Sequence, residues 1–179
     1  MRTFLVGLLL LVASSVVLAD DQPALKVGDR APDFQLPYAT RDSIASDSLS
    51  LAKLVSRNNV VLAFYPADWS GGCTKEVCTL RDNFTQLASL NADVVAISGD
   101  YVFSHHEWAV HHNLPFKLAS DHKHEVAKKY GSYMEPYGFN KRTVFVVDKK
   151  GNIAYMDMAY SVRDSVSFGK LQTALKSLK

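Results

Sequence analysis

The sequence predicts an α/β fold in which helices cover both faces of a mixed central sheet. Two apolar runs, 60–65 and 93–98, are rich in β-branched residues, which is typical of buried strands. A segment with apolar residues at helical spacing follows each run. Residues 143–147 and 153–158 indicate a hairpin, and the last segment, 166–178, again has helical spacing. Strands that alternate with helices in this way predict a sheet covered on both faces.

The N-terminal part of the predicted fold carries weaker signals. Residues 27–34 indicate a turn that leads into an edge strand, and the polar stretch 38–48 indicates an exposed loop. Ser50 is placed to cap a short helix that ends near Val55, because a serine hydroxyl can accept a hydrogen bond from the first helical turn. A turn at residues 58–59 then leads into the first apolar run.

The helix after the strand at 60–65 starts in a glycine-containing turn. Pro66 ends the strand, and the sequence Ser-Gly-Gly at 70–72 forms the turn. Cys73 falls in or just before the first helical turn, where unpaired N–H groups and the helix dipole favour a thiolate over a thiol. The apolar residues at helical spacing that follow are Val77, Leu80, Phe84 and Leu87.

A further helix is predicted after the strand at 93–98. Asp100 is placed to cap this helix, which extends to His112. Phe103 and Val110 are expected on its buried side, because they are separated by two helical turns.

Short elements complete the predicted fold. Residues 116–119 indicate a strand, Asp121 is placed to cap a helix around 126–130, and 131–141 is expected to be a loop. With the hairpin and the last helix, the order of elements is β-α-β-α-β-β-α. This order is that of a thioredoxin-like fold.

The composition is that of a single globular domain, which we place at residues 24–179. The chain has 179 residues, of which 47% are hydrophobic and 21% charged, enough for a sizeable core. The formal net charge is +2 and no block of Lys and Arg stands out, which argues against a nucleic acid partner.

Residues 1–19 resemble a signal peptide. Arg2 supplies a short positive start, 4–12 is an apolar core, and small residues at 17–19 offer a cleavage site before Asp20. An uncleaved membrane anchor is the alternative, but the apolar core is short for spanning a bilayer. We therefore expect an exported protein, periplasmic or secreted.

Both cysteines fall within six positions, at Cys73 and Cys78. In an exported protein an even number of cysteines usually indicates a structural disulfide. A loop this short would restrict the unfolded chain little, so stapling is a weak explanation. We therefore interpret the two residues as a working thiol pair.

The segment around these cysteines resembles the active-site motif of peroxiredoxins. Pro66, Ser70 and Cys73 stand as P-x-x-x-S-x-x-C, and 73–82 is similar to the branch that includes bacterioferritin comigratory protein and peroxiredoxin Q. The resemblance covers residues 24–178. Outside the motif it is carried by the segments 27–36, 97–100, 114–121 and 142–148.

The resemblance implies a thiol peroxidase that needs no cofactor or metal and reduces hydrogen peroxide and organic hydroperoxides. Cys73 would attack the peroxide as a thiolate and become a sulfenic acid. Ser70 would hydrogen-bond the peroxide and the sulfur, and Pro66 would shield the sulfur from water. Arg142 would favour the thiolate and stabilise developing charge on oxygen.

The resemblance assigns roles to two more residues and implies an electron donor. Glu76 matches a position that helps to orient the arginine, and Cys78 matches a resolving cysteine that closes an intramolecular disulfide. Five residues of α-helix separate two Cα atoms by ~8.7 Å, beyond the ~7 Å limit for a disulfide, so the helix around Cys73 must unwind. A dithiol donor such as a thioredoxin-like protein would reduce the disulfide, and we expect a monomer or weak homodimer.

Two positions depart from the family pattern. Trp69 stands where relatives carry a smaller or polar residue, and Gly71 replaces a common proline. Neither change removes a reacting group, but both would alter peroxide access or loop mobility.

Two other functions remain open on the same fold. An exported thiol–disulfide oxidoreductase normally uses Cys-x-x-Cys, which lets two sulfurs meet at a helix start. A copper-binding thioredoxin-like protein uses Cys-x-x-x-Cys and a distant histidine. Here the spacing is Cys-x-x-x-x-Cys, which favours the peroxidase.

All six histidines lie between His105 and His124, which suggests a metal site. On a helix, however, ligands for one ion are three or four residues apart. His105, His106, His111 and His112 contain no such pair. We therefore expect packing or solvated roles for the histidines.

Overall fold

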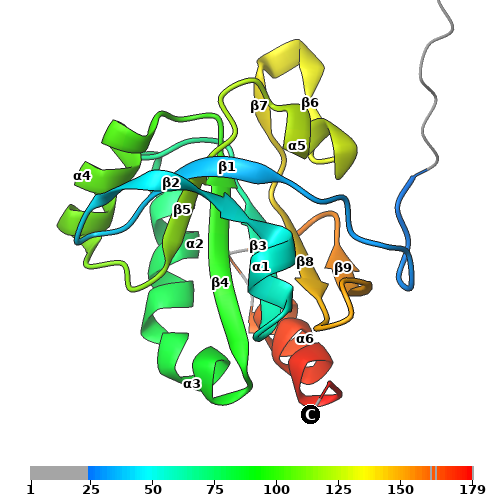
Figure 1. Ribbon diagram of the computed structural model, residues 1–179. Helices are drawn as coiled ribbons and strands as arrows, with labels where there is room; N and C mark the ends of the chain where they lie inside the picture. The colour runs from blue at the N-terminus through cyan, green and yellow to red at the C-terminus, as the bar shows by residue number, and fades with distance from the viewer. Residues whose placement is uncertain (1–23, 162, 164, 179) are drawn as a thin grey trace, which may run out of the picture.

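The computed structural model describes residues 24–161, 163 and 165–178, so the predicted signal segment at 1–19 lies outside the described residues. The strands of the main sheet are β1 (Gln35–Ala39), β2 (Ile44–Ser50), β3 (Asn59–Phe64), β4 (Ala92–Ser98), β5 (Lys117–Ser120), β8 (Thr143–Val147) and β9 (Ile153–Asp157). They lie in the order β2-β1-β5-β4-β3-β8-β9 (Figure 1). The helices are α1 (Leu51–Val55), α2 (Gly71–Asp82), α3 (Phe84–Ser89), α4 (Val102–His112), α5 (Glu125–Lys129) and α6 (Ser165–Lys176).

The centre of the sheet consists of strands whose residues are buried on both faces. Every residue of β3 and of β8 is buried, which explains why both sequences are apolar after a polar first residue, Asn59 in β3 and Thr143 in β8. Strand β3 pairs in parallel with β4, and β4 in parallel with β5, whereas β8 runs antiparallel to β3. The sheet is therefore mixed, as predicted.

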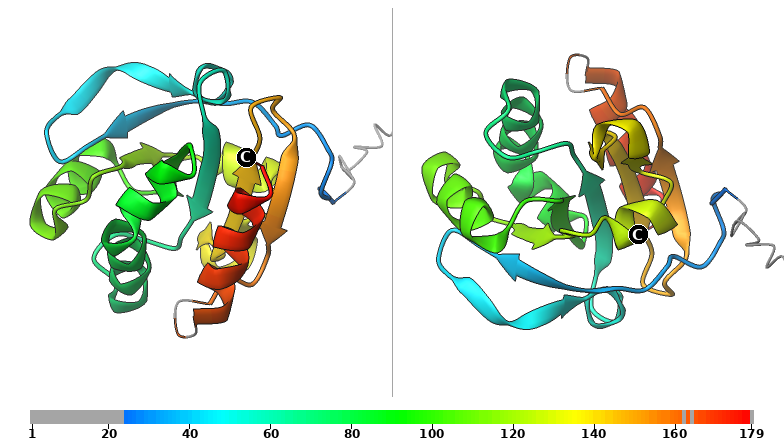
Figure 2. Two further views of the ribbon diagram at one scale, coloured as in Figure 1. Left: turned by 90° about the horizontal axis from the view of Figure 1, so that it is seen from below. Right: turned by 90° about the horizontal axis from the view of Figure 1, so that it is seen from above.

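Alternate residues of β3 enter two separate cores. Val61 and Ala63 pack with side chains of α2, α3, α4 and α6, whereas Val60 and Leu62 pack with side chains of α1 and α5. Helices consequently cover both faces of the sheet (Figure 2). The α/β, thioredoxin-like fold predicted from the sequence is confirmed.

Ser50 is the N-cap of α1 as predicted, whereas the N-cap residue of α5 is His124 and the predicted Asp121 bonds the first turn of that helix from three residues earlier. The Ser50 hydroxyl accepts a hydrogen bond from the backbone N–H of Lys53 at 3.4 Å, at the start of α1. The carboxylate of Asp121 accepts bonds from the backbone N–H groups of Val126 at 3.2 Å and Ala127 at 2.7 Å, at the start of α5. In both cases a side chain satisfies backbone donors that the helix itself leaves unpaired.

The prediction for α4 was wrong about its cap and its buried side. Phe103 and Val110 are 70% and 51% exposed, and the buried side carries His105, Trp108 and Ala109. The carboxylate of Asp100 does not cap the helix, because it accepts bonds from the Ser98 hydroxyl and from the backbone N–H of Asp68. On the buried side of α4, His105 contacts the buried carboxylate of Asp68, a tertiary contact that apolar spacing does not predict.

Three predictions about irregular segments were also wrong. Part of the expected loop at 38–48 is strand β2, which is mostly exposed and therefore lacks the alternating pattern of a half-buried strand. The expected edge strand is β1, which begins after residues 27–34 and lies between β2 and β5 inside the sheet. The expected loop at 131–141 contains a small hairpin, β6 (Tyr133–Met134) and β7 (Phe139–Asn140), joined by a 3₁₀ helix, η1 (Glu135–Tyr137).

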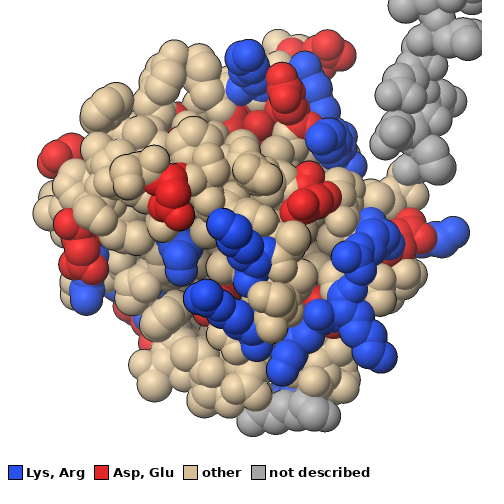
Figure 3. Space-filling view, in the orientation of Figure 1, with Lys and Arg blue, Asp and Glu red and all other residues tan. Residues whose placement is uncertain are grey.

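One face of the molecule carries charges of both signs (Figure 3). On the face shown in Figure 3, acidic side chains lie among the basic ones, so that face is not uniformly basic. Within the described part of the chain, no helix combines the length and apolarity needed to cross a membrane.

We expect Asp121→Ala to lower the free energy of unfolding by about 2 kcal/mol, because two buried N–H groups lose their acceptor. Urea unfolding measures the change. Glu125→Ala is the control: Glu125 is an exposed acidic residue in the first turn of α5, and its loss should cost less than about 0.5 kcal/mol. Equal effects in the two variants would contradict the capping role of Asp121.

Candidate active site

The loop between β3 and α2 places Cys73 at the start of a helix. Ser70 is the N-cap of α2 in extended conformation, and its hydroxyl accepts a hydrogen bond from the backbone N–H of Cys73 at 3.4 Å. Cys73 is the third residue of α2, as the sequence predicted. At this position the dipole of the helix favours a negative charge on the sulfur.

Arg142 lies against Cys73 because of the pairing of two strands. It directly precedes Thr143, the first residue of β8, and Thr143 pairs with Phe64, the last residue of β3. The chain therefore reaches Arg142 and the active-site loop at the same end of the sheet. The Arg142 Nη2 donates to the Cys73 sulfur at 3.1 Å, and the side chain of Cys73 is completely buried.

Glu76 completes a cluster of charged groups around this arginine. The Arg142 Nη1 donates to Glu76 Oε2 at 2.5 Å, and the second carboxylate oxygen is buried without a hydrogen-bond partner among the described residues. Burial raises the pKa of Glu76 to about 7, although the nearby arginine lowers it in part. Burial lowers the pKa of Arg142, but Glu76 and Cys73 raise it by more, so the guanidinium stays charged.

Cys78 lies five residues further along the intact helix α2. It is partly buried, and both cysteines are free thiols in this structure. Helix geometry puts the two Cα atoms ~8.7 Å apart, so the disulfide predicted between them requires α2 to unwind locally.

Pro66 and Ser70 are both in the active-site loop, which we define as residues 66–70. Pro66 is partly buried and directly follows Tyr65, and Ser70 is exposed. Among the described hydrogen bonds, the Ser70 hydroxyl contacts the backbone of Cys73 and not the sulfur. The contact with the sulfur comes from Arg142.

Gly72 brings the start of α2 close to the arginine. A Cβ atom at Gly72 would lie 2.8 Å from Arg142 Nη2, closer than such atoms approach in proteins, whereas a Cβ atom at Gly71 would meet nothing within 4 Å. Gly72 is therefore the residue that leaves room for the guanidinium beside Cys73.

Apart from His111 and His112, whose rings lie against each other, the histidines occupy separate environments. In the described part of the chain, no group of three or more His, Cys, Asp or Glu residues is placed to hold a metal ion. His105 pairs with Asp68, whereas His111 and His112 lie against the ring of Trp69. His106 contacts the Thr40 carbonyl, His122 the Tyr101 hydroxyl and His124 the Asn140 side chain.

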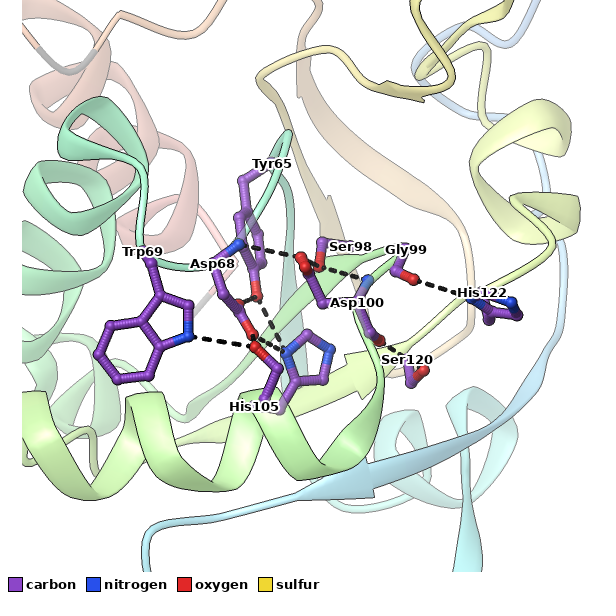
Figure 4. Close-up of polar contacts among 10 residues, drawn as sticks. Tyr65, Asp68, Trp69, Ser98, Gly99, Asp100, His105, Ser120 and His122 are labelled. Carbon is purple, nitrogen blue, oxygen red and sulfur yellow. Dashed lines mark hydrogen bonds and ion pairs between the residues drawn. The ribbon is translucent and has the colours of Figure 1, made fainter.

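The sequence did not identify the polar network beneath the active-site loop. The side chains of Asp68 and His105 are completely buried, and His105 Nδ1 lies 2.9 Å from an Asp68 carboxylate oxygen, a hydrogen-bond distance (Figure 4). The one available signal was an aspartate two residues before the helix cap. Its partner could not be identified, because helical spacing predicted a different buried side for α4.

A buried thiol at a helix N-terminus, in contact with a guanidinium, is an arrangement that activates cysteine as a nucleophile. Similarity to known proteins also indicates a protein with an activated cysteine. Residues 27–156 match the AhpC/TSA family. Peroxiredoxin Bcp of Bacillus subtilis is 31% identical over 163 residues, which cover 87% of this chain and 96% of that protein.

Two further comparisons agree. The chloroplastic peroxiredoxin Q of Oryza sativa subsp. japonica is 38% identical over 130 residues, which cover 72% of this chain and 57% of the rice protein. The crystal structure of peroxidoxin BcpB from Mycobacterium tuberculosis has a TM-score of 0.76 at 30% identity, covering 87% of this chain and 99% of the other. The chain belongs to the AhpC/TSA family and is a peroxiredoxin, similar to the Bcp and peroxiredoxin Q proteins.

We expect Gly72→Ala to slow alkylation of Cys73 about tenfold at neutral pH, because the added methyl group displaces the charged donor of the sulfur. The pH dependence of iodoacetamide labelling should move upward. Gly71→Ala is the matched control and should label like wild type, since its methyl group meets no other residue. Identical profiles for both variants would show that the contact with Arg142 does not activate Cys73.

Proposed function

We propose that the protein reduces hydrogen peroxide and organic hydroperoxides with Cys73 as the attacking thiolate. The observation that carries this proposal is the 3.1 Å contact between Arg142 Nη2 and the Cys73 sulfur at the start of α2. In the first step an S–O bond forms while the O–O bond breaks, so that sulfur loses two electrons and becomes a sulfenic acid. The hydroxide or alkoxide that leaves takes a proton from solvent.

The neighbouring groups can stabilise the charge that this step transfers to oxygen. Arg142 carries the permanent positive charge beside the sulfur, and Glu76 holds one of its nitrogens. Ser70 has a hydroxyl that can also donate to the peroxide. Pro66, which the family resemblance assigns to shielding the sulfur from water, is in the same loop and partly buried. Because Cys73 is completely buried, peroxide must enter through a small movement of the exposed helix start at residues 70–72.

Cys78 is proposed to resolve the sulfenic acid. Its thiol would attack the oxidised sulfur, form a disulfide and release water. A dithiol donor, such as a thioredoxin-like protein, would then reduce the disulfide by thiol–disulfide exchange. All these side chains belong to one chain, so a monomer or weak homodimer suffices.

Family membership and cysteine spacing both favour this function over the two alternatives. The thiol–disulfide oxidoreductase and the copper-binding protein normally use two or three residues between their cysteines, whereas four separate Cys73 from Cys78.

We expect Cys73→Ser to abolish peroxide consumption with dithiothreitol as donor, because a hydroxyl is a far weaker nucleophile than a thiolate at neutral pH. Peroxide should lower the mass of wild type by about 2 Da, since a disulfide contains two hydrogens fewer than two thiols. Cys78→Ser should instead gain oxygen on Cys73, first as sulfenic and then as sulfinic acid.

Circular dichroism of each variant is the control for folding. If Cys73→Ser consumed peroxide at the wild-type rate, the proposed mechanism would be wrong. If oxidised wild type formed disulfide-linked dimers and no intramolecular disulfide, Cys78 would not be the resolving residue. The first step at Cys73 would still stand.

We further propose that the protein is exported, on the sequence pattern of residues 1–19. Mass spectrometry of protein from the cell that produces it should find Asp20 as the first residue, because cleavage follows small residues. Full-length chain in the membrane fraction would favour an uncleaved anchor instead.

A further inference from the structure

The carboxylate of Asp68 is buried beneath the active-site loop and accepts three hydrogen bonds. The Tyr65 hydroxyl donates to one oxygen at 2.7 Å, and the Ser104 hydroxyl donates to the other, also at 2.7 Å. The Nδ1 of His105 lies 2.9 Å from that second oxygen. In this contact a carboxylate oxygen is the acceptor and the imidazole Nδ1 is the donor.

These donors join the loop to two secondary-structure elements. Tyr65 directly follows strand β3, whereas Ser104 and His105 are in the first turns of α4 (Figure 4). The side chains of Asp68 and His105 are both completely buried. Removal of one partner of such a buried network leaves the others unsatisfied, so the network strongly favours this one position of the loop.

Two further bonds hold the same stretch of backbone. The N–H of Asp68 donates to the Asp100 carboxylate at 2.9 Å, and the Trp69 indole donates to the Ser104 hydroxyl at 3.2 Å. Trp69 has a φ of 61°, in the left-handed region that non-glycine residues seldom adopt. The contacts with α4 therefore compensate a strained backbone directly before the cap of α2.

The loop transmits this position to the reacting cysteine through Ser70. The N–H of Ser70 donates to the Asp68 carbonyl at 2.8 Å, and the Ser70 hydroxyl accepts from the N–H of Cys73. A displacement of the carboxylate would consequently move the helix cap, and with it the sulfur relative to Arg142.

We propose that Asp68 is a positioning residue of the peroxidase site, which holds the active-site loop on α4 so that α2 begins at Ser70 and presents Cys73 to Arg142. The proposal deepens the proposed function and rests on it for the peroxide step. It also implies that the unwinding of α2 starts after the anchored Trp69, at the exposed residues 70–72.

The test is Asp68→Asn, which keeps the size of the side chain but places an amide among three donors. Peroxide oxidation of Cys73, measured by stopped flow, should slow by about tenfold to a hundredfold, as expected for a misplacement near 1 Å. The pH profile of Cys73 alkylation should move upward, an effect that a loss of global stability alone would not produce.

Two further variants provide a second test and a control. Ser104→Ala removes one donor from the carboxylate and the acceptor of the Trp69 indole. It should slow peroxide oxidation of Cys73 by about fivefold and move the alkylation profile upward, as in Asp68→Asn. His106→Ala changes the neighbouring residue of α4, whose contact is with the Thr40 carbonyl, and it should react like wild type. If Asp68→Asn does not fold, Ser104→Ala decides the question.

The outcomes separate the two proposals. The positioning role is supported if Asp68→Asn or Ser104→Ala slows oxidation of Cys73 and moves its alkylation profile to higher pH. His106→Ala should do neither. Unchanged alkylation in folded Asp68→Asn or, failing that, in Ser104→Ala overturns it. If wild type consumes no peroxide, the proposed function fails, yet the alkylation profiles still test whether Asp68 positions Cys73.

Discussion

The contact of one guanidinium with both Cys73 and Glu76 is the interaction on which the site depends. Arg142 enters from the start of β8, whereas both of its partners are on α2. A partly buried charge needs compensation, and here a carboxylate and a sulfur that can ionise provide it. The pairing of β8 with β3 makes this meeting possible, because it brings Arg142 to the end of the sheet where α2 starts.

The proposed mechanism places two opposed requirements on the site, and different segments would meet them. Activation of the thiol needs an ordered helix start, which Ser70 and Arg142 provide. Closure of a disulfide with Cys78 needs the same turns to unwind. Exposed glycines follow directly after Ser70, whereas the preceding loop is tied to α4 through the buried carboxylate of Asp68. The anchored loop and the backbone that would unwind are therefore only a few residues apart, on either side of Ser70.

Where the sequence predictions succeeded, the pattern was local or was carried by a motif. The strand at 60–65 and the helix start at Cys73 follow from apolar periodicity and from turn residues. The proximity of Arg142 to Cys73 was inferred from the family resemblance, since no local pattern relates residues so far apart. Strand β2 was missed because its mostly exposed residues show no apolar alternation, and its pairing with β1 is a tertiary contact that the local pattern does not reveal.

The sequence by itself determined the α/β class, the place of Cys73 on a strand–turn–helix junction and the identity of the residues in its motif. Only the tertiary structure decided the rotation of α4, which buries His105 and leaves Phe103 exposed. The physical reason is that the buried carboxylate of Asp68 needs donors, and two of them, Ser104 and His105, come from α4, far away in the sequence. Apolar periodicity records which residues avoid water, but it does not record which buried polar groups must find each other.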